Sequence, residues 1–264
     1  MKYKFDHDVH LEREGENQFV IEISSDWNIV APHGGYLMAI AGNAFLETTS
    51  FKVPLSMTAY YHRPTLPGKA ILYVDKVMEN KRLVTAKIAL IQDDTEIISF
   101  IGTFARENAF KGLTIIQKQP LLPDPNACIE LPLPRYPFFN QVKLCVPPAQ
   151  FSWLDGDDRG ETFFSGYFSF QDGRPLDGLA VLLLADASPP PILRYTGPVQ
   201  WVPTIEMSVQ VRSIPSGTYL GFVSSTNFVT NGFTETDVEL WSEKGEIVAI
   251  GRQLAVIREN SRST

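Results

Sequence analysis

Residues 32–45 read PHGGYLMAIAGNAF, and residues 175–188 read PLDGLAVLLLADAS. The two stretches align without gaps, so that Gly35 falls on Gly178. Each begins with a proline and a glycine and continues as a mostly apolar run, as expected where a turn opens into a buried helix. A fixed order of similar segments along a chain is the mark of an internal repeat, and this pair is its clearest member.

Two further matches follow in the same order. SMTAYYHRP, starting at Ser56, resembles TIEMSVQVR, starting at Thr204, and IGTF, starting at Ile101, resembles IGRQ, starting at Ile250. The segments between them alternate apolar and polar residues, which is typical of strands with one buried face. In the first copy we expect strands at about 17–24, 57–62, 70–77, 83–91 and 97–105. The repeat therefore predicts a strand, a helix and four antiparallel strands, present twice.

This pattern predicts an α+β fold made of two tandem units, each with a long helix wrapped by an antiparallel sheet. We expect the helices over residues 34–46 and 176–186. The first unit is predicted to cover residues 1–107 and the second residues 137–264. Residues 108–136 are rich in proline, which removes backbone donors, and we interpret them as a linker.

Composition limits the classes of function. The chain has 264 residues, 44% of them hydrophobic, and a net charge of −7, so a globular core is expected and a nucleic-acid partner is not. The N-terminal stretch is charged, and the apolar run at 179–185 is too short to span a bilayer, which predicts a cytoplasmic protein without a membrane span. Cys128 and Cys145 have no metal-ligand spacing and are interpreted as inert thiols; we expect no metal and no cofactor.

Four segments, PHGGYLMA, LADASPP, WVPTIEMSVQVR and GRQLAVI, together resemble the double-hotdog acyl-CoA thioesterases, the group that includes bacterial thioesterase II. The resemblance extends over nearly the whole chain. It implies a double hotdog fold and hydrolysis of an acyl-CoA substrate to free acid and CoA. It also implies a water molecule held by Asp186, Thr204 and Gln253, and further pairing into a homo-oligomer.

The repeat offers an independent comparison for these three residues, because Asn43, Ser56 and Phe104 stand at the equivalent positions of the first unit. Only the second unit keeps a complete polar set. Burial of a carboxylate beside LAVLLLA would be costly without polar partners. We therefore interpret Asp186 as a general base that accepts a proton from water.

In this interpretation Thr204 and Gln253 orient the water, because a hydroxyl and an amide can each donate and accept hydrogen bonds. The alternative is that Asp186 ends its helix before Pro189 and lies in solvent. Taken singly, Thr204 and Gln253 would be ordinary strand residues.

The turn before the first helix is a candidate substrate site. Gly34 and Gly35 leave the backbone accessible, and the amides of Gly35 and Tyr36 are expected to be free donors that could bind the thioester carbonyl oxygen. Otherwise the glycines serve only helix–sheet packing. His33 is a cap or surface residue or contacts substrate, and Trp201 is close enough in sequence to Thr204 to line a tunnel.

Other classes of function remain open. Asp26, Asn28 and His33 resemble the D-x-N-P-x-H pattern of hotdog enoyl-CoA hydratases, although the spacing differs. A non-catalytic hotdog that binds acyl-CoA is a third possibility. Arg63 and Arg212 end equivalent strands, where they are surface residues or meet the CoA phosphates.

Overall fold

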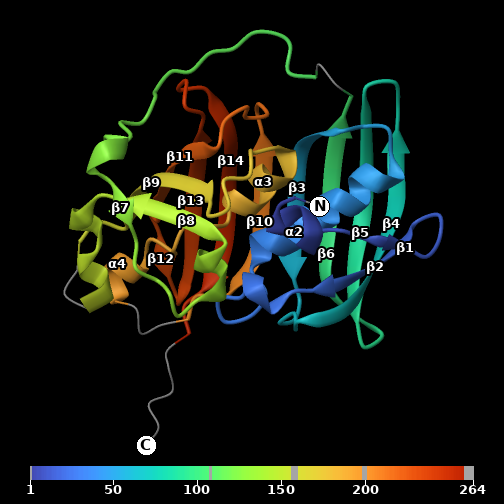
Figure 1. Cartoon of the computed structure of the whole chain (residues 1–264), viewed down its shortest axis with the longest axis horizontal. Helices are drawn as coiled ribbons and strands as arrows, with labels where there is room; N and C mark the ends of the chain where they lie inside the picture. Colours follow the sequence, from blue (N-terminus) through green and yellow to red (C-terminus); the bar gives the residue numbers. More distant parts are fainter. Residues whose placement is uncertain (1, 107–108, 156–159, 198–200, 259–264) are drawn as a thin grey trace, which may run out of the picture.

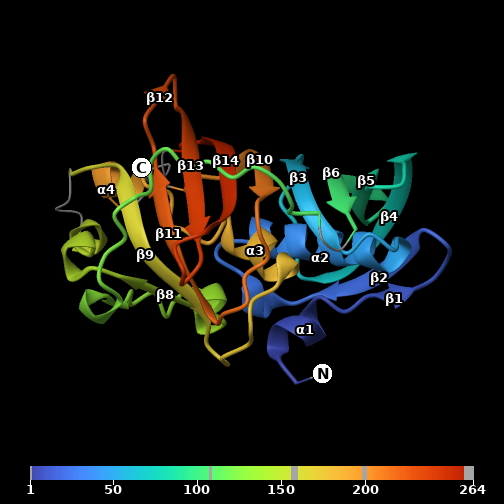
Figure 2. The ribbon, with the colours of Figure 1, turned by 90° about the horizontal axis from the view of Figure 1, so that it is seen from above.

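The computed structural model describes residues 2–106, 109–155, 160–197 and 201–258. Two similar units stand side by side and share one long antiparallel sheet (Figure 1). The two main helices lie against the same face of this sheet, near its middle (Figure 2). The fold is therefore the predicted double hotdog.

The first unit follows the expected order of elements. Its helix α2 covers Gly34–Thr48, close to the predicted range, and ten of its residues are buried because apolar side chains occur on nearly all sides. Its strands are β2 (Gln18–Ile23), β3 (Val53–Tyr61), β4 (Gly68–Glu79), β5 (Leu83–Gln92) and β6 (Thr95–Ala105).

The second unit repeats this order with a shorter helix. Its strands are β9 (Phe163–Phe170), β10 (Thr204–Val211), β11 (Tyr219–Ser225), β13 (Phe233–Trp241) and β14 (Ile247–Val256). Helix α3 covers only Gly178–Leu184, where we predicted 176–186. The Asp177 side chain caps the start by accepting from the Ala180 amide (2.8 Å), and Ala185 ends the helix. Asp186 consequently lies just beyond the helix rather than in it.

Strand order shows the internal symmetry. The first unit runs β2-β4-β5-β6-β3, and the second continues as β10-β14-β13-β11-β9, which is the same order reversed. Equivalent strands β3 and β10 pair antiparallel at the centre, where Thr58 and Ser208 face each other with their hydroxyl oxygens 2.9 Å apart. This arrangement is expected for two units related by a pseudo-twofold axis.

The helices meet at closely packed small residues. A Cβ atom at Gly42 of α2 would stand 2.8 Å from the Leu182 side chain of α3, so a larger residue there would force that side chain to shift. At Gly35 it would stand 2.3 Å from the Leu183 carbonyl oxygen. The start of α2 thus lies against the end of α3, a contact favoured by the opposite partial charges of the two helix ends.

Shorter elements complete the chain. They are α1 (Lys4–Asp8), β1 (Glu12–Arg13), β7 (Ile129–Glu130), β8 (Val142–Val146), β12 (Val229–Thr230) and α4 (Leu193–Thr196), with 3-10 turns at Ser25–Trp27, Pro125–Ala127, Pro137–Asn140, Pro148–Gln150 and Ser152–Asp155. Among them, β1, β8 and β7 extend the two edges of the sheet. Strand β7 lies inside the range predicted as linker and pairs with β8. Leu131 and Leu133, also in that range, are buried. In the described part of the chain no helix is long and apolar enough to cross a membrane.

Candidate active site

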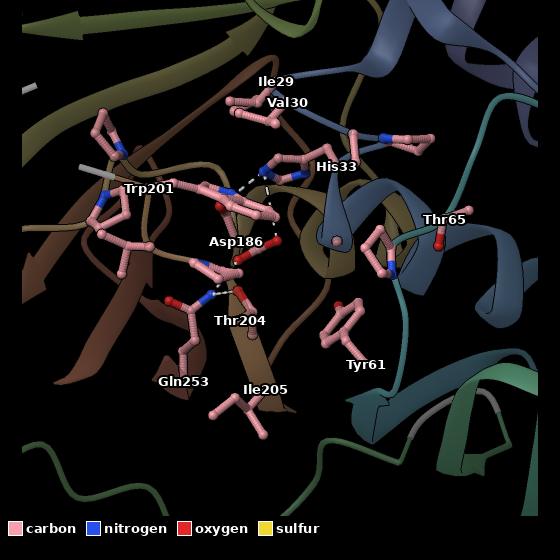
Figure 3. A pocket seen from close by; sticks show the side chains of 18 of the residues that line it. Ile29, Val30, His33, Tyr61, Thr65, Asp186, Trp201, Thr204, Ile205 and Gln253 are labelled. Carbon is pink, nitrogen blue, oxygen red and sulfur yellow. Dashed lines mark hydrogen bonds and ion pairs between the residues drawn. The ribbon is translucent and has the colours of Figure 1, made fainter. Parts of the chain in front are cut away.

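A cavity of about 500 Å³ opens where the two units meet (Figure 3). Its walls come from the turn before α2, the segment after β3, the segment after α3, and the facing ends of β10 and β14. Much of its apolar wall is formed by Leu133, Tyr136, Phe139, Trp153 and Leu193. Such a cavity combines an apolar lining with a few polar groups, as small-molecule sites commonly do.

Asp186 is the carboxylate of this cavity. Its side chain is only 10% exposed, so it does not lie in open solvent beyond the helix. Its Oδ2 atom accepts a hydrogen bond from the Gly35 amide (2.8 Å), and its Oδ1 atom accepts one from Gln253 Nε2 (3.0 Å). Burial raises the pKa of Asp186 above its usual range, against the opposing influence of His33 and the Gly35 amide.

Gln253 connects the three residues predicted to hold water. Its amide nitrogen donates to Asp186 Oδ1 and also to Thr204 Oγ1 (2.5 Å). Thr204 begins β10 and Gln253 lies on β14, and these strands are paired neighbours. Sheet pairing therefore brings the threonine and glutamine together, and the segment after α3 supplies the aspartate.

His33 lies beside Asp186 without capping α2 through its side chain. Its ring is 7% exposed and stacks on Phe138 with ring centroids 4.0 Å apart. Nε2 stands 3.1 Å from the Asp186 carbonyl oxygen and 3.6 Å from its Oδ2 atom. Burial lowers the pKa of His33, so the neutral ring donates from Nε2 to the carbonyl.

The glycine turn fulfils two different roles. Gly34 lines the cavity, and a Cβ atom there would stand 2.7 Å from Asp186 Oδ2 and 2.8 Å from the Tyr61 hydroxyl oxygen. The Gly35 amide donates to Asp186. The Tyr36 side chain is fully buried away from the cavity lining, stacks on Trp27 and donates to the Asp8 carbonyl (2.7 Å).

Unpaired polar atoms concentrate around the cavity. Buried side-chain atoms without a hydrogen-bond partner in the described structure include His33 Nδ1, Tyr61 Oη, Thr65 Oγ1 and Trp153 Nε1, and all four residues line it. Buried polar groups are nearly always paired in folded proteins, so this concentration indicates a site for a polar ligand or water.

Three of these residues, Tyr61, Thr65 and Trp153, were not among the sequence candidates. Strand alternation could have pointed to Tyr61, because Met57 and Ala59 mark the buried face of β3 and Tyr61 continues it. Thr65 and Trp153 gave no comparable signal, since both lie outside the long strands.

The outer part of the cavity lining, where Arg63 and Arg258 are exposed, is called its mouth here. Trp201 lines the cavity, and the Arg258 guanidinium lies over its ring, 5.2 Å from the centroid. Arg63 also lines the cavity, whereas Arg212 bonds to Gln210 and is not part of the lining.

The positions of the first unit that the sequence repeat aligns with the site hold no polar cluster. The strand register also corrects that alignment, because the matching bulges place Pro54, not Ser56, at the position of Thr204 and Gly102, not Phe104, at that of Gln253. Asn43 donates to the Val9 carbonyl (2.8 Å), and Phe104 is fully buried and stacks on Phe45 at 3.9 Å. Of the residues that resemble a hydratase motif, Asp26 pairs with Lys4 (2.7 Å), and neither Asp26 nor Asn28 lines the cavity. Among the described residues no group of three or more His, Cys, Asp or Glu side chains could hold a metal ion.

Comparison with protein families gives two matches in tandem. Residues 23–105 match the model of the acyl-CoA thioesterase N-terminal domain, and residues 119–257 match that of the C-terminal domain. None of the curated proteins matches the chain.

Solved structures share the whole fold. A candidate thioesterase II from Thermobifida fusca YX is 26% identical, with a TM-score of 0.89 over 97% of this chain and 98% of its own. A hot dog fold protein of unknown function from Alicyclobacillus acidocaldarius is 20% identical, with a TM-score of 0.87 over 98% and 100%. Acyl-CoA thioesterase II TesB2 from Mycobacterium marinum is 16% identical, with a TM-score of 0.77 over 97% and 99%. For the second and third of these structures, which are 20% and 16% identical, the similarity concerns the fold alone.

Proposed function

Since the chain belongs to the acyl-CoA thioesterase family, we propose that it hydrolyses an acyl-CoA thioester to a free acid and CoA at the cavity around Asp186. The observation that carries the proposal is the hydrogen bonding of Gln253, whose single amide nitrogen joins Asp186 and Thr204. A structural role alone would not require three polar side chains from three elements to converge at a cavity wall.

In the proposed reaction Asp186 is the general base. Each of its carboxylate oxygens already accepts one hydrogen bond and can accept another, so a water molecule can bind there. The Thr204 hydroxyl accepts from Gln253 and thereby keeps its own proton free to donate to the same water. The water is then held with a lone pair free to attack.

The chemical step follows from this arrangement. Asp186 takes a proton as the water oxygen bonds to the thioester carbonyl carbon, and the carbonyl oxygen becomes an oxyanion. When the carbonyl reforms, the carbon–sulfur bond breaks and the leaving thiolate receives the proton from Asp186. The raised pKa of Asp186 suits both proton transfers.

The substrate is proposed to place its acyl chain along the apolar wall and its CoA portion at the mouth. Trp201, Arg258 and Arg63 at the mouth offer an aromatic face and two cations to the nucleotide and its phosphates. A local basic mouth reconciles an anionic substrate with the net charge of −7. His33 is proposed to hold the Asp186 backbone in place.

The test is a hydrolysis screen with a thiol reagent over acetyl-, hexanoyl-, dodecanoyl- and palmitoyl-CoA. We expect turnover with at least one of them and its loss in Asp186→Asn. Binding of the corresponding S-alkyl-CoA thioether, which cannot be hydrolysed, should persist in that variant. Binding without turnover by the unaltered protein would instead favour a non-catalytic acyl-CoA-binding protein.

A further inference from the structure

Tyr61 is a polar group of the cavity that the proposed reaction does not yet use. It ends β3, where alternation turns neighbouring tyrosines to opposite faces of the sheet. Tyr60 is 50% exposed, whereas the Tyr61 side chain lines the cavity on the side of Asp186 (Figure 3).

The Tyr61 hydroxyl is buried and makes no hydrogen bond within the described structure. An unpaired buried hydroxyl costs about 1–3 kcal/mol, so such a group is rarely kept without a partner. Its position at a cavity wall means that a bound molecule can supply that partner.

Gly34 places this hydroxyl next to the proposed base. The position that a Gly34 Cβ atom would take is 2.8 Å from the Tyr61 oxygen and 2.7 Å from Asp186 Oδ2. Both oxygens therefore border one gap, which exists because residue 34 has no side chain. A thioester carbonyl in that region would have the base on one side and the phenol on the other.

The amide that could have served the same carbonyl is already bonded. Gly35 N–H, predicted from the sequence to be a free donor, donates to Asp186 Oδ2 at 2.8 Å. The Tyr61 hydroxyl is a donor that makes no hydrogen bond within the described structure. It also keeps its proton, because burial and the nearby carboxylates of Asp186 and Glu206 raise its pKa well above the ordinary value.

We propose that Tyr61 is a further catalytic residue whose hydroxyl donates a hydrogen bond to the thioester carbonyl oxygen and stabilises the oxyanion formed there. The inference rests on the proposed hydrolysis. Tyr61 keeps its proton throughout: water supplies the proton that Asp186 accepts and passes to the thiolate, and only the hydrogen bond from Tyr61 strengthens as charge develops.

The first test is Tyr61→Phe, which keeps the ring and removes only the hydroxyl. Loss of one oxyanion donor should lower kcat by about 10²–10³-fold. The matched control is Tyr60→Phe, which removes the hydroxyl of the adjacent residue on the outer face and should leave kcat unchanged. Equal kcat for Tyr61→Phe and the unaltered protein would overturn the role of Tyr61 while leaving the proposed hydrolysis intact. Absence of turnover in the unaltered protein would contradict the proposed function itself.

A second measurement separates a catalytic from a structural role. Two non-hydrolysable ligands are compared: an S-alkyl-CoA thioether, which lacks the carbonyl, and an S-(2-oxoalkyl)-CoA ketone, which has one. Tyr61→Phe should weaken binding of the ketone by about tenfold and leave binding of the thioether unchanged. Equal weakening of both would show that Tyr61 only shapes the cavity, and would overturn the proposal.

Discussion

The amide of Gly35 donates to the carboxylate of Asp186 across 2.8 Å, and the two residues come from different units of the repeat. The bond joins the start of α2 to the segment that follows α3. An N-terminal helix amide is a favourable partner for a carboxylate, because the first amides of a helix lack partners and carry partial positive charge. The candidate base is therefore held by the unit to which it does not belong.

Replacement of Asp186 by asparagine tests the base directly. The side chain keeps its size but can no longer accept a proton, so we expect kcat to fall by about 10²–10⁴-fold with little change in thioether binding. Asn43→Ala alters the equivalent residue of the first unit and serves as the control. If Asn43→Ala lost turnover and Asp186→Asn did not, the base would lie in the first unit.

Thr204→Val and Gln253→Leu should each reduce turnover, because a water that is no longer oriented spends less time in attacking geometry. Each loss should become smaller when combined with Asp186→Asn, since the three groups act on one water. Steady-state rates of the single and double variants give this comparison, with Ser56→Ala, the position aligned with Thr204 in the sequence repeat, as the control. Fully additive losses would mean that the three residues act independently.

Gly34→Ala should close the gap beside Asp186. The new Cβ atom would stand under 3.0 Å from both Asp186 Oδ2 and the Tyr61 oxygen, so one of them must shift, and we expect kcat/KM to fall by about 10²-fold. Gly178→Ala is the matched control. Gly178 is the first residue of α3, and its new Cβ atom would meet Pro54 at 2.8 Å, outside the cavity lining. Thermal unfolding of both variants checks folding, and equal activity of the two would contradict the prediction.

The pH dependence of kcat/KM should report the buried carboxylate. A general base works when it is deprotonated, and burial raises the pKa of Asp186, so activity should decline on acidification at a higher pH than for an ordinary aspartate. Rate profiles between about pH 4 and pH 9 would show this limb. Thr204→Val should lower the maximal kcat/KM without changing the pH at which kcat/KM declines. A decline of kcat/KM only in the pH range where an exposed aspartate titrates would contradict the role of Asp186 as general base.

His33→Ala should affect stability more than chemistry. The substitution removes a ring stacked on Phe138 and a bond to the Asp186 carbonyl, so we expect a loss of about 1–3 kcal/mol in unfolding free energy. Turnover should fall by no more than about tenfold, because the side-chain bonds of Asp186 to Gly35 and Gln253 remain. Complete inactivation of a folded variant would assign His33 a direct part in the reaction, as in the hydratase alternative.

Much of the fold could be predicted because short segments of similar sequence occur in the same order in both units. Gly35 and Gly178 mark the two helix starts, and strand alternation gives most of the sheet. The end of α3 was predicted too late, because apolar residues continue past Leu184 although the backbone leaves the helix there.

The candidate site was harder to predict where it depends on contacts between units. Thr204 and Gln253 could be named from the resemblance, and their neighbouring strands bring them together. The bond from Gly35 to Asp186 and the nearness of Tyr61 depend on how α2 and α3 pack against each other, which no pattern within either segment specifies.

Counted from the matching bulges of β3 and β10, Gly102, which pairs with Met57, occupies the position in the first unit that Gln253, which pairs with Met207, occupies in the second. In a homodimer of single units every substitution appears in both copies, so a glycine at this position would abolish both sites together. Fusion of the copies into one gene product removes that constraint. One copy can then accumulate residues chosen for rigidity alone, and the other can retain a polar cluster that a well-packed interior would otherwise exclude.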